Sequence, residues 1–446
     1  MRLKKLTVKN FKSLRDCEIE LGKFNVLVGA NASGKTNLVE VFKLLRKIYV
    51  ERDTNPFLEW WGYNNVVWAG KEELPITVGM LFDVEGYDVY FETTFTGTGG
   101  SFRILKEVLE IRNYMKIEKE GRFLTINHDK NWLEMALSEL KTVEDRDFLI
   151  YKHFANLSTL DLEVIEKELP ASFVDKSLLK TLPGKGTSIY DSQSKVAYTI
   201  SEIPYNSSVH RIPIVSPTIK WGQHETISPL YWEFGILMNK FLWGPIILRQ
   251  IFIKELKTPQ YPRKEATLKE DASNLIPFLY NIWLREGMLP EKIAKPLSIA
   301  FPDTRVFFQL TEDGRVMMKV FENDLELAPP GISDGFYKVL ALLTAVYLKP
   351  PLLIIDEIEN SLHPETLELI IDTLRESESQ VIITTHSPVV VDIVEPSDLV
   401  LVDKEEGETV FRRIKDPEKI KKSLNEKGIT LSEGWLYGSL FESDDQ

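Results

Sequence analysis

Three short, largely apolar runs lie far apart along the chain, at residues 24–28, 351–355 and 381–385. Runs of this length without polar alternation are typical of strands buried on both faces of a parallel sheet. Residues 36–45 and 336–348 instead repeat their apolar positions at helical spacing. Together these segments predict a parallel sheet with covering helices, formed from both ends of the chain.

A second pattern, alternation of apolar and polar residues between turn signals, predicts antiparallel strands. It is strongest over residues 76–112, and it recurs in a short pair at 3–8 and 17–21. Residues 304–322 predict a hairpin that turns at Asp313-Gly314. We therefore expect antiparallel strands beside the parallel sheet.

The middle of the chain follows neither pattern. Residues 132–179 and 231–256 carry leucine and charged residues at helical spacing, whereas 183–229, rich in glycine, serine and proline, indicates loops. We predict a mainly helical insertion over 113–259. It separates an N-terminal lobe (1–112) from a C-terminal lobe (260–446) of one α/β domain.

Composition excludes several classes of protein. The chain has 446 residues and a formal net charge of −13, which argues against a protein that coats nucleic acid. Its single cysteine, Cys17, excludes a disulfide framework and a multi-cysteine zinc site. The basic start lacks the apolar core of a signal peptide, and no run approaches the ~20 apolar residues of a membrane helix. We expect a cytoplasmic protein without membrane contact.

The segment GANASGKT, from Gly29 to Thr36, satisfies the phosphate-loop pattern between a strand and a helix. In such a loop successive N–H groups face one anion, and the helix N-terminus adds positive charge. Lys35 is expected to reach the β- and γ-phosphates of ATP, and the Thr36 hydroxyl to hold Mg²⁺. The predicted nucleotide-binding residues are Gly29, Asn31, Ala32, Ser33, Gly34, Lys35, Thr36 and Asn37.

Two carboxylates, Asp356 and Glu357, end the second apolar run. Alternation along a strand sends their side chains in different directions, so they can take different roles. Asp356 suits the Mg²⁺ shell, and Glu357 suits a general base that orients the attacking water. His386 ends the third run, and a single histidine at a strand end is more often structural than catalytic.

Two turns precede helices in the same region. Ser333-Asp334-Gly335 opens the apolar helix at 336–348, and by itself this is only a serine-capped helix. Asn360, Ser361 and His363 precede Pro364, a residue that favours the first position of a helix.

The succession of these motifs resembles the ATPase heads of the ABC class. The resemblance is to the branch of chromosome-maintenance, recombination-repair and overcoming-lysogenization-defect proteins. The segments VKNFKSL at 8–14 and GWLYG at 434–438 also resemble that branch, and the match covers 1–112 and 260–446. It implies an ABC-type P-loop ATPase head, a mixed sheet with an antiparallel β subdomain, and a homodimer that closes head-to-head on ATP.

The resemblance also implies roles for residues. Lys35, Glu357 and His386 would be the catalytic group, and His386 would sense the γ-phosphate. Thr36 and Asp356 would hold the metal. The signature acting in trans on the partner's nucleotide would be Ser333, Asp334 and Gly335, and the turn between the two sites would be Asn360, Ser361 and His363.

Two departures from the family pattern are visible. Asp334 stands where the usual signature has a glycine before Gly335. The family's first lobe normally supplies a metal-contacting glutamine, but no glutamine occurs between Thr36 and Ile150. Glu107 and Glu110 are the stand-ins that the sequence offers.

Two functions remain open. The first is an ATP-hydrolysing switch that couples hydrolysis to DNA or a partner effector, in DNA repair or anti-phage defence. The alternative is an ATP-dependent regulatory scaffold for a separate nuclease or toxin chain, with little turnover of its own. Sixty residues follow His386, too few for a nuclease domain of the usual size, so we expect none in this chain.

Basic residues near the start of the chain leave a related question open. They either form a nucleic-acid face or line a solvated sheet edge. The residues concerned are Lys4, Lys5, Lys9, Lys12 and Arg15.

Overall fold

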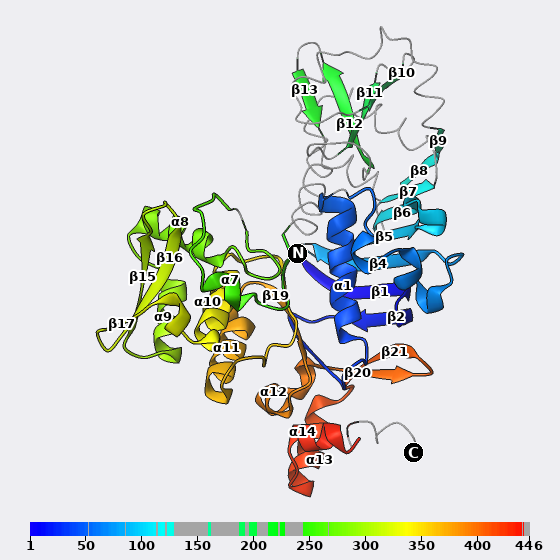
Figure 1. Ribbon diagram of the computed structural model, residues 1–446. Helices are drawn as coiled ribbons and strands as arrows, with labels where there is room; N and C mark the ends of the chain where they lie inside the picture. Colours follow the sequence, from blue (N-terminus) through cyan, green and yellow to red (C-terminus); the bar gives the residue numbers. More distant parts are fainter. Residues whose placement is uncertain are drawn as a thin grey trace, which may run out of the picture. The chain divides into compact units, whose positions relative to one another are not determined.

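The computed structural model describes residues 1–51, 53–84, 86–112, 115–120, 123–128, 159–161, 187–191, 196–202, 213–221, 224–227, 244–265, 267–438 and 440 (Figure 1). The chain divides into two compact units, each assembled from separate segments of sequence. Unit 1 comprises Met1–Ile19 and Val41–Trp243, and unit 2 comprises Glu20–Glu40 and Gly244–Gln446. None of the helices in the described ranges is long and apolar enough to cross a bilayer.

Unit 2 is built on a mixed sheet in the order β14-β18-β19-β3-β20-β21. Its strands are β14 (Ile246–Leu248), β18 (Leu352–Ile355), β19 (Gln380–Thr385), β3 (Phe24–Val28), β20 (Leu399–Glu405) and β21 (Glu408–Arg413). Every neighbouring pair from β14 to β20 is parallel, and β21 pairs antiparallel with β20. The strands β18, β19 and β3 are buried along their whole length, which is why their sequences are apolar runs.

A largely apolar helix of unit 2 is buried over most of its length. This helix, α10 (Asp334–Tyr347), is buried from Phe336 to Ala345 and contacts α9 (Glu291–Ala300) and α11 (Pro364–Glu376) (Figure 1). A helix without a polar face is stable only when neighbours cover it all round. The other helices described in this unit are α7 (Ile253–Leu256), α8 (Leu275–Glu286), α12 (Pro388–Ile393), α13 (Pro417–Lys427) and α14 (Leu431–Leu436), while α1 (Lys35–Arg46) begins here and continues into unit 1.

A small antiparallel sheet completes unit 2. It consists of β15 (Thr304–Leu310), β16 (Val316–Glu322) and β17 (Leu325–Leu327), and α8 contacts β16. The link between β15 and β16 contains Asp313 and Gly314, so the predicted hairpin is confirmed.

Unit 1 contains an antiparallel sheet in the order β2-β1-β4-β5-β6-β7-β8-β9. Its strands are β1 (Arg2–Phe11), β2 (Leu14–Glu20), β4 (Ile76–Val84), β5 (Tyr87–Thr96), β6 (Arg103–Ile111), β7 (Met115–Glu120), β8 (Phe123–His128) and β9 (Thr159–Asp161). Buried aromatic side chains, among them Phe82, Phe91 and Phe95, form its core. The alternation over residues 76–112 therefore predicted the strands correctly.

The middle of the chain departs from the prediction. Loops were expected over 183–229, but this range contains an antiparallel sheet of β10 (Thr187–Asp191), β11 (Val196–Glu202), β12 (Pro213–Trp221) and β13 (His224–Ile227) (Figure 1). β-branched and aromatic residues in these segments favoured strands, and the glycine, serine and proline between them obscured that signal. A helix was also expected over 132–179, but Thr159–Asp161 form β9 of the unit 1 sheet. The rest of that expected helix lies outside the described residues.

The boundary after the insertion also needs correction. A helix was expected over 231–256 and the C-terminal lobe from 260, yet residues 246–248 form β14 of the unit 2 sheet. The run of three buried residues, Ile246–Leu248, was hidden inside a longer apolar region. The phosphate loop, expected in the N-terminal lobe, is grouped with the later residues in unit 2.

Candidate nucleotide site

The register of the parallel strands brings four separate chain segments to one edge of the unit 2 sheet. Leu248 is the partner of Ile355, and Ile355 is the partner of Ile383. On the next strand, Thr385 is the partner of Val28. The residues that follow these strand ends are Arg249, Asp356, His386 and Gly29. Loops at the carboxyl ends of parallel strands form the usual ligand site of an open α/β sheet.

The phosphate loop follows β3 and is held closely against β20. A Cβ atom at Gly29 would lie 2.1 Å from the carbonyl oxygen of Val402, so only glycine fits there. The Thr409 hydroxyl donates a hydrogen bond to the carbonyl oxygen of Ser33 at 2.8 Å. The tip of the loop, Asn31 and Ala32 included, is exposed to solvent. The rest of the chain thus fixes the base of the loop and leaves its tip accessible.

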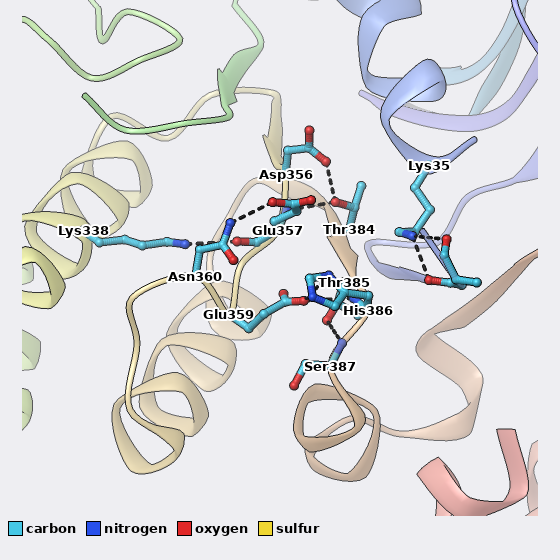
Figure 2. A network of polar contacts seen from close by, with 12 residues as sticks. Lys35, Lys338, Asp356, Glu357, Glu359, Asn360, Thr384, Thr385, His386 and Ser387 are labelled. Atoms are coloured by element: carbon cyan, nitrogen blue, oxygen red, sulfur yellow. Dashed lines mark hydrogen bonds and ion pairs between the residues drawn. The ribbon is translucent and has the colours of Figure 1, made fainter. Parts of the chain in front are cut away.

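Lys35 is folded back over its own loop. Its Nζ donates to the carbonyl oxygens of Gly29 at 2.7 Å and Ala30 at 2.9 Å (Figure 2). Burial lowers the pKa of Lys35 below its ordinary value, while nearby carboxylates, chiefly that of Asp356, act in the opposite direction. The hydroxyl oxygen of Ser33 is buried and has no hydrogen-bond partner among the described residues. A phosphate oxygen would supply that missing partner.

Asp356 lies directly after β18 and is anchored by three groups. Its N–H donates to the carbonyl oxygen of Leu248 at 2.8 Å. Its Oδ1 accepts from the Thr384 hydroxyl at 2.5 Å, and its Oδ2 is 3.5 Å from Nε of Arg249. The carboxylate is buried, so its orientation is well defined.

Arg249 is a site residue that the sequence analysis missed. Its Nη1 lies 3.6 Å from Oε1 of both Glu40, on α1, and Glu270. Together with Asp356, these carboxylates surround one guanidinium group. One feature of the sequence could have identified Arg249. It directly follows a short apolar run, as Asp356 directly follows β18.

Gln250 is a candidate for the glutamine position, for which the sequence suggested only Glu107 or Glu110. Gln250 is exposed and lies two residues after β14, the strand next to β18. Glu107 and Glu110 are both on β6 of unit 1, and Glu107 accepts a hydrogen bond from the Tyr49 hydroxyl at 2.8 Å. Gln250 lies far from the N-terminal lobe in sequence because the insertion precedes β14.

Glu357 has an unusual backbone conformation that several contacts maintain. Its φ is +52°, in the left-handed region that residues other than glycine rarely adopt. Its N–H donates to the Thr384 hydroxyl at 2.9 Å, and its carbonyl oxygen accepts from Nζ of Lys338 at 3.0 Å. Its Oε2 accepts from Nδ2 of Asn360 at 2.7 Å (Figure 2). Such strain persists where the surroundings enforce it, as they commonly do at functional sites.

His386 has a carboxylate partner. Its backbone N–H donates to Oε1 of Glu359 at 2.9 Å, and its Nδ1 lies 3.0 Å from the same carboxylate oxygen (Figure 2). The imidazole is exposed to solvent. The histidine at this strand end is therefore oriented by a neighbouring acid, which the sequence analysis did not foresee.

The first turn of α10 is capped as predicted. The Ser333 hydroxyl accepts from the N–H of Phe336 at 3.2 Å, and Asp334 forms an ion pair of 2.7 Å with Lys257. Both Ser333 and Asp334 are exposed. Pro364 occupies the first position of α11, with His363 as an exposed N-cap residue.

The donor set fits a magnesium–nucleotide complex better than an all-protein metal site. Across the described ranges, no group of three or more histidine, cysteine, aspartate or glutamate side chains could hold a metal ion. Mg²⁺ typically takes one or two protein ligands and completes its shell with phosphate oxygens and water. Thr36 and Asp356 would be these protein ligands.

Three of the five basic residues near the start of the chain are paired with carboxylates. Ion pairs join Lys4 to Asp88, Lys5 to Glu18 and Lys9 to Asp16. Lys12 lies over the ring of Trp60, and Arg15 over that of Trp68. Exposed pairs of this kind are typical of a solvated surface, which favours the sheet-edge interpretation.

Two family models match the sequence. The model described as "AAA ATPase domain" matches residues 1–213, and the model described as "AAA domain, putative AbiEii toxin, Type IV TA system" matches residues 234–392. The two matches leave only 214–233 of the insertion uncovered, and they include the phosphate loop and the Asp356–Glu357 strand end. Comparison with the curated proteins found no match.

Solved structures with a similar arrangement include heads of chromosome-maintenance (SMC) proteins. The SMC head domain from Thermotoga maritima shares 13% identity at a TM-score of 0.40, covering 93% of this chain and 100% of that one. An SMC head from Pyrococcus furiosus, bound to the C-terminal domain of ScpA, shares 15% at 0.43, covering 96% and 99%. One from Pyrococcus yayanosii shares 14% at 0.42, again covering 96% and 99%. The α/β P-loop fold of this chain rests on its own sheet order and phosphate loop.

Proposed function

We propose that this protein is an ATP-binding and ATP-hydrolysing molecular switch whose two nucleotide sites are completed when two chains associate head-to-head. The matches to AAA-type ATPase domains support the ATP-binding and ATP-hydrolysing part. The observation that carries the proposal is the strand register, because it aligns the ends of the phosphate-loop strand, the Asp356 strand and the His386 strand.

Each group at this edge has a chemical task in the proposal. The phosphate loop binds the β- and γ-phosphates through its N–H groups, and Lys35 leaves the loop carbonyls to neutralise them. Mg²⁺, held by Thr36 and Asp356, would neutralise charge that develops on the phosphate oxygens. Glu357 accepts a proton from the attacking water, and His386 offers Nε2 toward the γ-phosphate.

Gln250 is the residue that we propose for the glutamine of the first lobe. It follows the strand beside β18, on the same edge of the sheet as Asp356. Its side-chain amide can accept from a metal-bound water and donate to the attacking one. Glu107 instead has its carboxylate hydrogen-bonded to Tyr49 within unit 1.

The proposed dimer rests on the first turn of α10. A helix N-terminus with an exposed serine hydroxyl is a good ligand for phosphate, and Ser333 presents one to solvent. By the resemblance described above, Ser333, Asp334 and Gly335 would contact the nucleotide of a second copy. Asn360, Ser361 and His363 would then lie in the turn between the two sites.

The experiment that tests the proposal uses Glu357→Gln, which keeps the shape of the side chain but removes the base. We expect this variant to bind ATP, to hydrolyse it at least 100-fold more slowly, and to accumulate as a dimer in size-exclusion chromatography with ATP and Mg²⁺. Glu368→Gln, an exposed position on α11, is the matched control and should behave like wild type. Unchanged hydrolysis in Glu357→Gln would remove Glu357 from its proposed role.

The alternative function is a regulatory scaffold that binds ATP and controls a separate effector chain with little turnover. The description of the model matched by residues 234–392 names a toxin–antitoxin system, which favours an effector of that class. The same measurement separates the two functions. A wild-type protein that dimerises with ATP but hydrolyses less than one ATP per hour would support the scaffold.

A further inference from the structure

Lys338 is a charged residue in the middle of an apolar helix. It lies within the stretch of α10 that is buried from Phe336 to Ala345, and only 6% of its surface is exposed. Lysine is almost never buried to this degree unless it is paired. Burial lowers the pKa of Lys338 to about 8, although Glu359 and Glu357 act in the opposite direction. The fold therefore carries an energetic cost at this position.

The hydrogen bond that Lys338 forms is directed at Glu357. Its Nζ donates to the backbone carbonyl oxygen of Glu357 at 3.0 Å and approaches from α10, whereas Lys35 lies on the opposite side of the Asp356–Glu357 pair (Figure 2). This carbonyl belongs to the residue with φ of +52°. The contact thus holds the backbone of Glu357 rather than its carboxylate. It fixes the position of the Cα atom from which the side chain extends.

The same loop touches α10 at a second place. A Cβ atom at Gly335 would lie 2.8 Å from the carbonyl oxygen of Ser361, so the helix can approach this closely only with glycine. Ser361 also has a positive φ, of 63°. Because Gly335 and Lys338 are three residues apart, they lie one above the other on one face of the helix. The start of α10 and residues 357–361 are therefore joined at two points.

We propose that Lys338 is a positioning residue that fixes Glu357 for hydrolysis and links it to the first turn of α10 in the same chain. The link rests on the proposed function, in which that first turn meets the nucleotide of a second copy. Without the Lys338 contact, residue 357 loses one of the hydrogen bonds that hold its strained conformation, so its backbone and carboxylate can shift. A displacement of about 1 Å in a reacting group can lower a rate on the order of 100-fold.

The test compares four variants of the full chain. Lys338→Met and Lys338→Gln remove the contact, because neither side chain can reach the carbonyl with a charged donor. Lys338→Arg keeps a charged donor. Lys349→Met is the control, since Lys349 follows the far end of α10 and forms an exposed ion pair with Glu378.

Two readouts are measured on each variant. We expect the Met and Gln variants to lose at least 10-fold in ATP turnover, with an ATP dissociation constant within threefold of wild type. In hydrogen–deuterium exchange without nucleotide, their amides at 357–362 should exchange at least fivefold faster. Lys338→Arg should recover most of the turnover, and Lys349→Met should match wild type in both readouts.

The outcomes separate this inference from the proposed function. Wild-type exchange at 357–362 in both the Met and Gln variants would overturn the role of Lys338. Slow turnover without faster exchange would overturn it as well, because the loop would then be held by other contacts. A wild-type protein that hydrolyses no ATP would refute the proposed function, and the exchange data would still decide whether Lys338 holds the loop.

Discussion

The Thr384 hydroxyl donates a hydrogen bond to Oδ1 of Asp356 at 2.5 Å. The hydroxyl oxygen of Thr384 in turn accepts a hydrogen bond from the N–H of Glu357 at 2.9 Å. One side chain on β19 thus orients two consecutive residues that end β18, the candidate metal ligand and the candidate base. Because Thr384 is fully buried, water cannot replace either bond.

Thr384→Val should therefore damage both activity and stability. The variant keeps the volume of the side chain but leaves a buried carboxylate oxygen and a buried N–H without their partner. We expect turnover to fall at least 10-fold and the free energy of unfolding to fall by about 1–3 kcal/mol. Steady-state ATPase assays and urea unfolding measure the two effects. Thr373→Val, on α11, is the control and should change neither by a comparable amount.

Arg249 should stabilise the unliganded site by neutralising the carboxylates around it. Arg249→Gln leaves Asp356, Glu40 and Glu270 to repel one another, so we expect a loss of about 1–3 kcal/mol in the free energy of unfolding. Millimolar Mg²⁺ should restore part of the loss in the variant while changing wild type less. Arg305→Gln, which removes an exposed ion pair with Asp324, is the comparison. Equal stability of Arg249→Gln and wild type without Mg²⁺ would contradict the neutralising role.

Substitutions at Gln250 and at Glu107 should have different effects on ATP turnover and on thermal stability. Gln250→Ala should lower turnover at least 10-fold and weaken activation by Mg²⁺, with little change in thermal stability because the side chain is exposed. Glu107→Gln should lower the melting temperature, since the carboxylate is buried with Tyr49, and leave the Mg²⁺ dependence as in wild type. A titration of ATPase activity with Mg²⁺ checks both variants. If Glu107→Gln weakened activation by Mg²⁺ and Gln250→Ala did not, Glu107 rather than Gln250 would be the residue near the metal.

The buried Lys338 should make the stability of the protein depend on pH in a characteristic direction. The pKa is 10.5 in the unfolded chain and about 8 in the fold, so between these values the unfolded state binds the extra proton. Stability therefore rises with pH from about 8 to 10.5. Below pH 8 the burial costs about 3 kcal/mol.

Lys338→Met removes this contribution. At pH 7 the variant should be more stable than wild type by about 2 kcal/mol, after allowance for the lost hydrogen bond to Glu357. The difference in unfolding free energy between the two proteins should shrink as pH approaches 10. Guanidinium unfolding at pH 7, 8.5 and 10 measures it, and Lys349→Met serves as the control. A variant that is less stable than wild type at pH 7 would show that Lys338 contributes to packing more than it costs.

Local patterns were sufficient for much of the fold. The phosphate loop, the Asp356–Glu357 strand end and the capped helix at Ser333 are each contiguous in sequence, and their chemistry follows from neighbouring residues. The strands predicted within 3–21 and 76–112 and the hairpin predicted at 304–322 were confirmed because their patterns are local as well. The predictions failed at the described strands β10 to β14, which have little periodicity from which to distinguish them.

The residues of the candidate site likewise fall into those identified from local sequence and those identified only from the folded structure. The sequence by itself identified the candidate phosphate loop and the acid that follows a buried strand, because a turn and a strand end are local features. Only the tertiary structure decided that Arg249 faces Asp356, that Glu359 orients His386, and that Lys338 supports Glu357. These contacts depend on strand order and on the packing of α10, and residues that meet in this way carry no common signal along the chain.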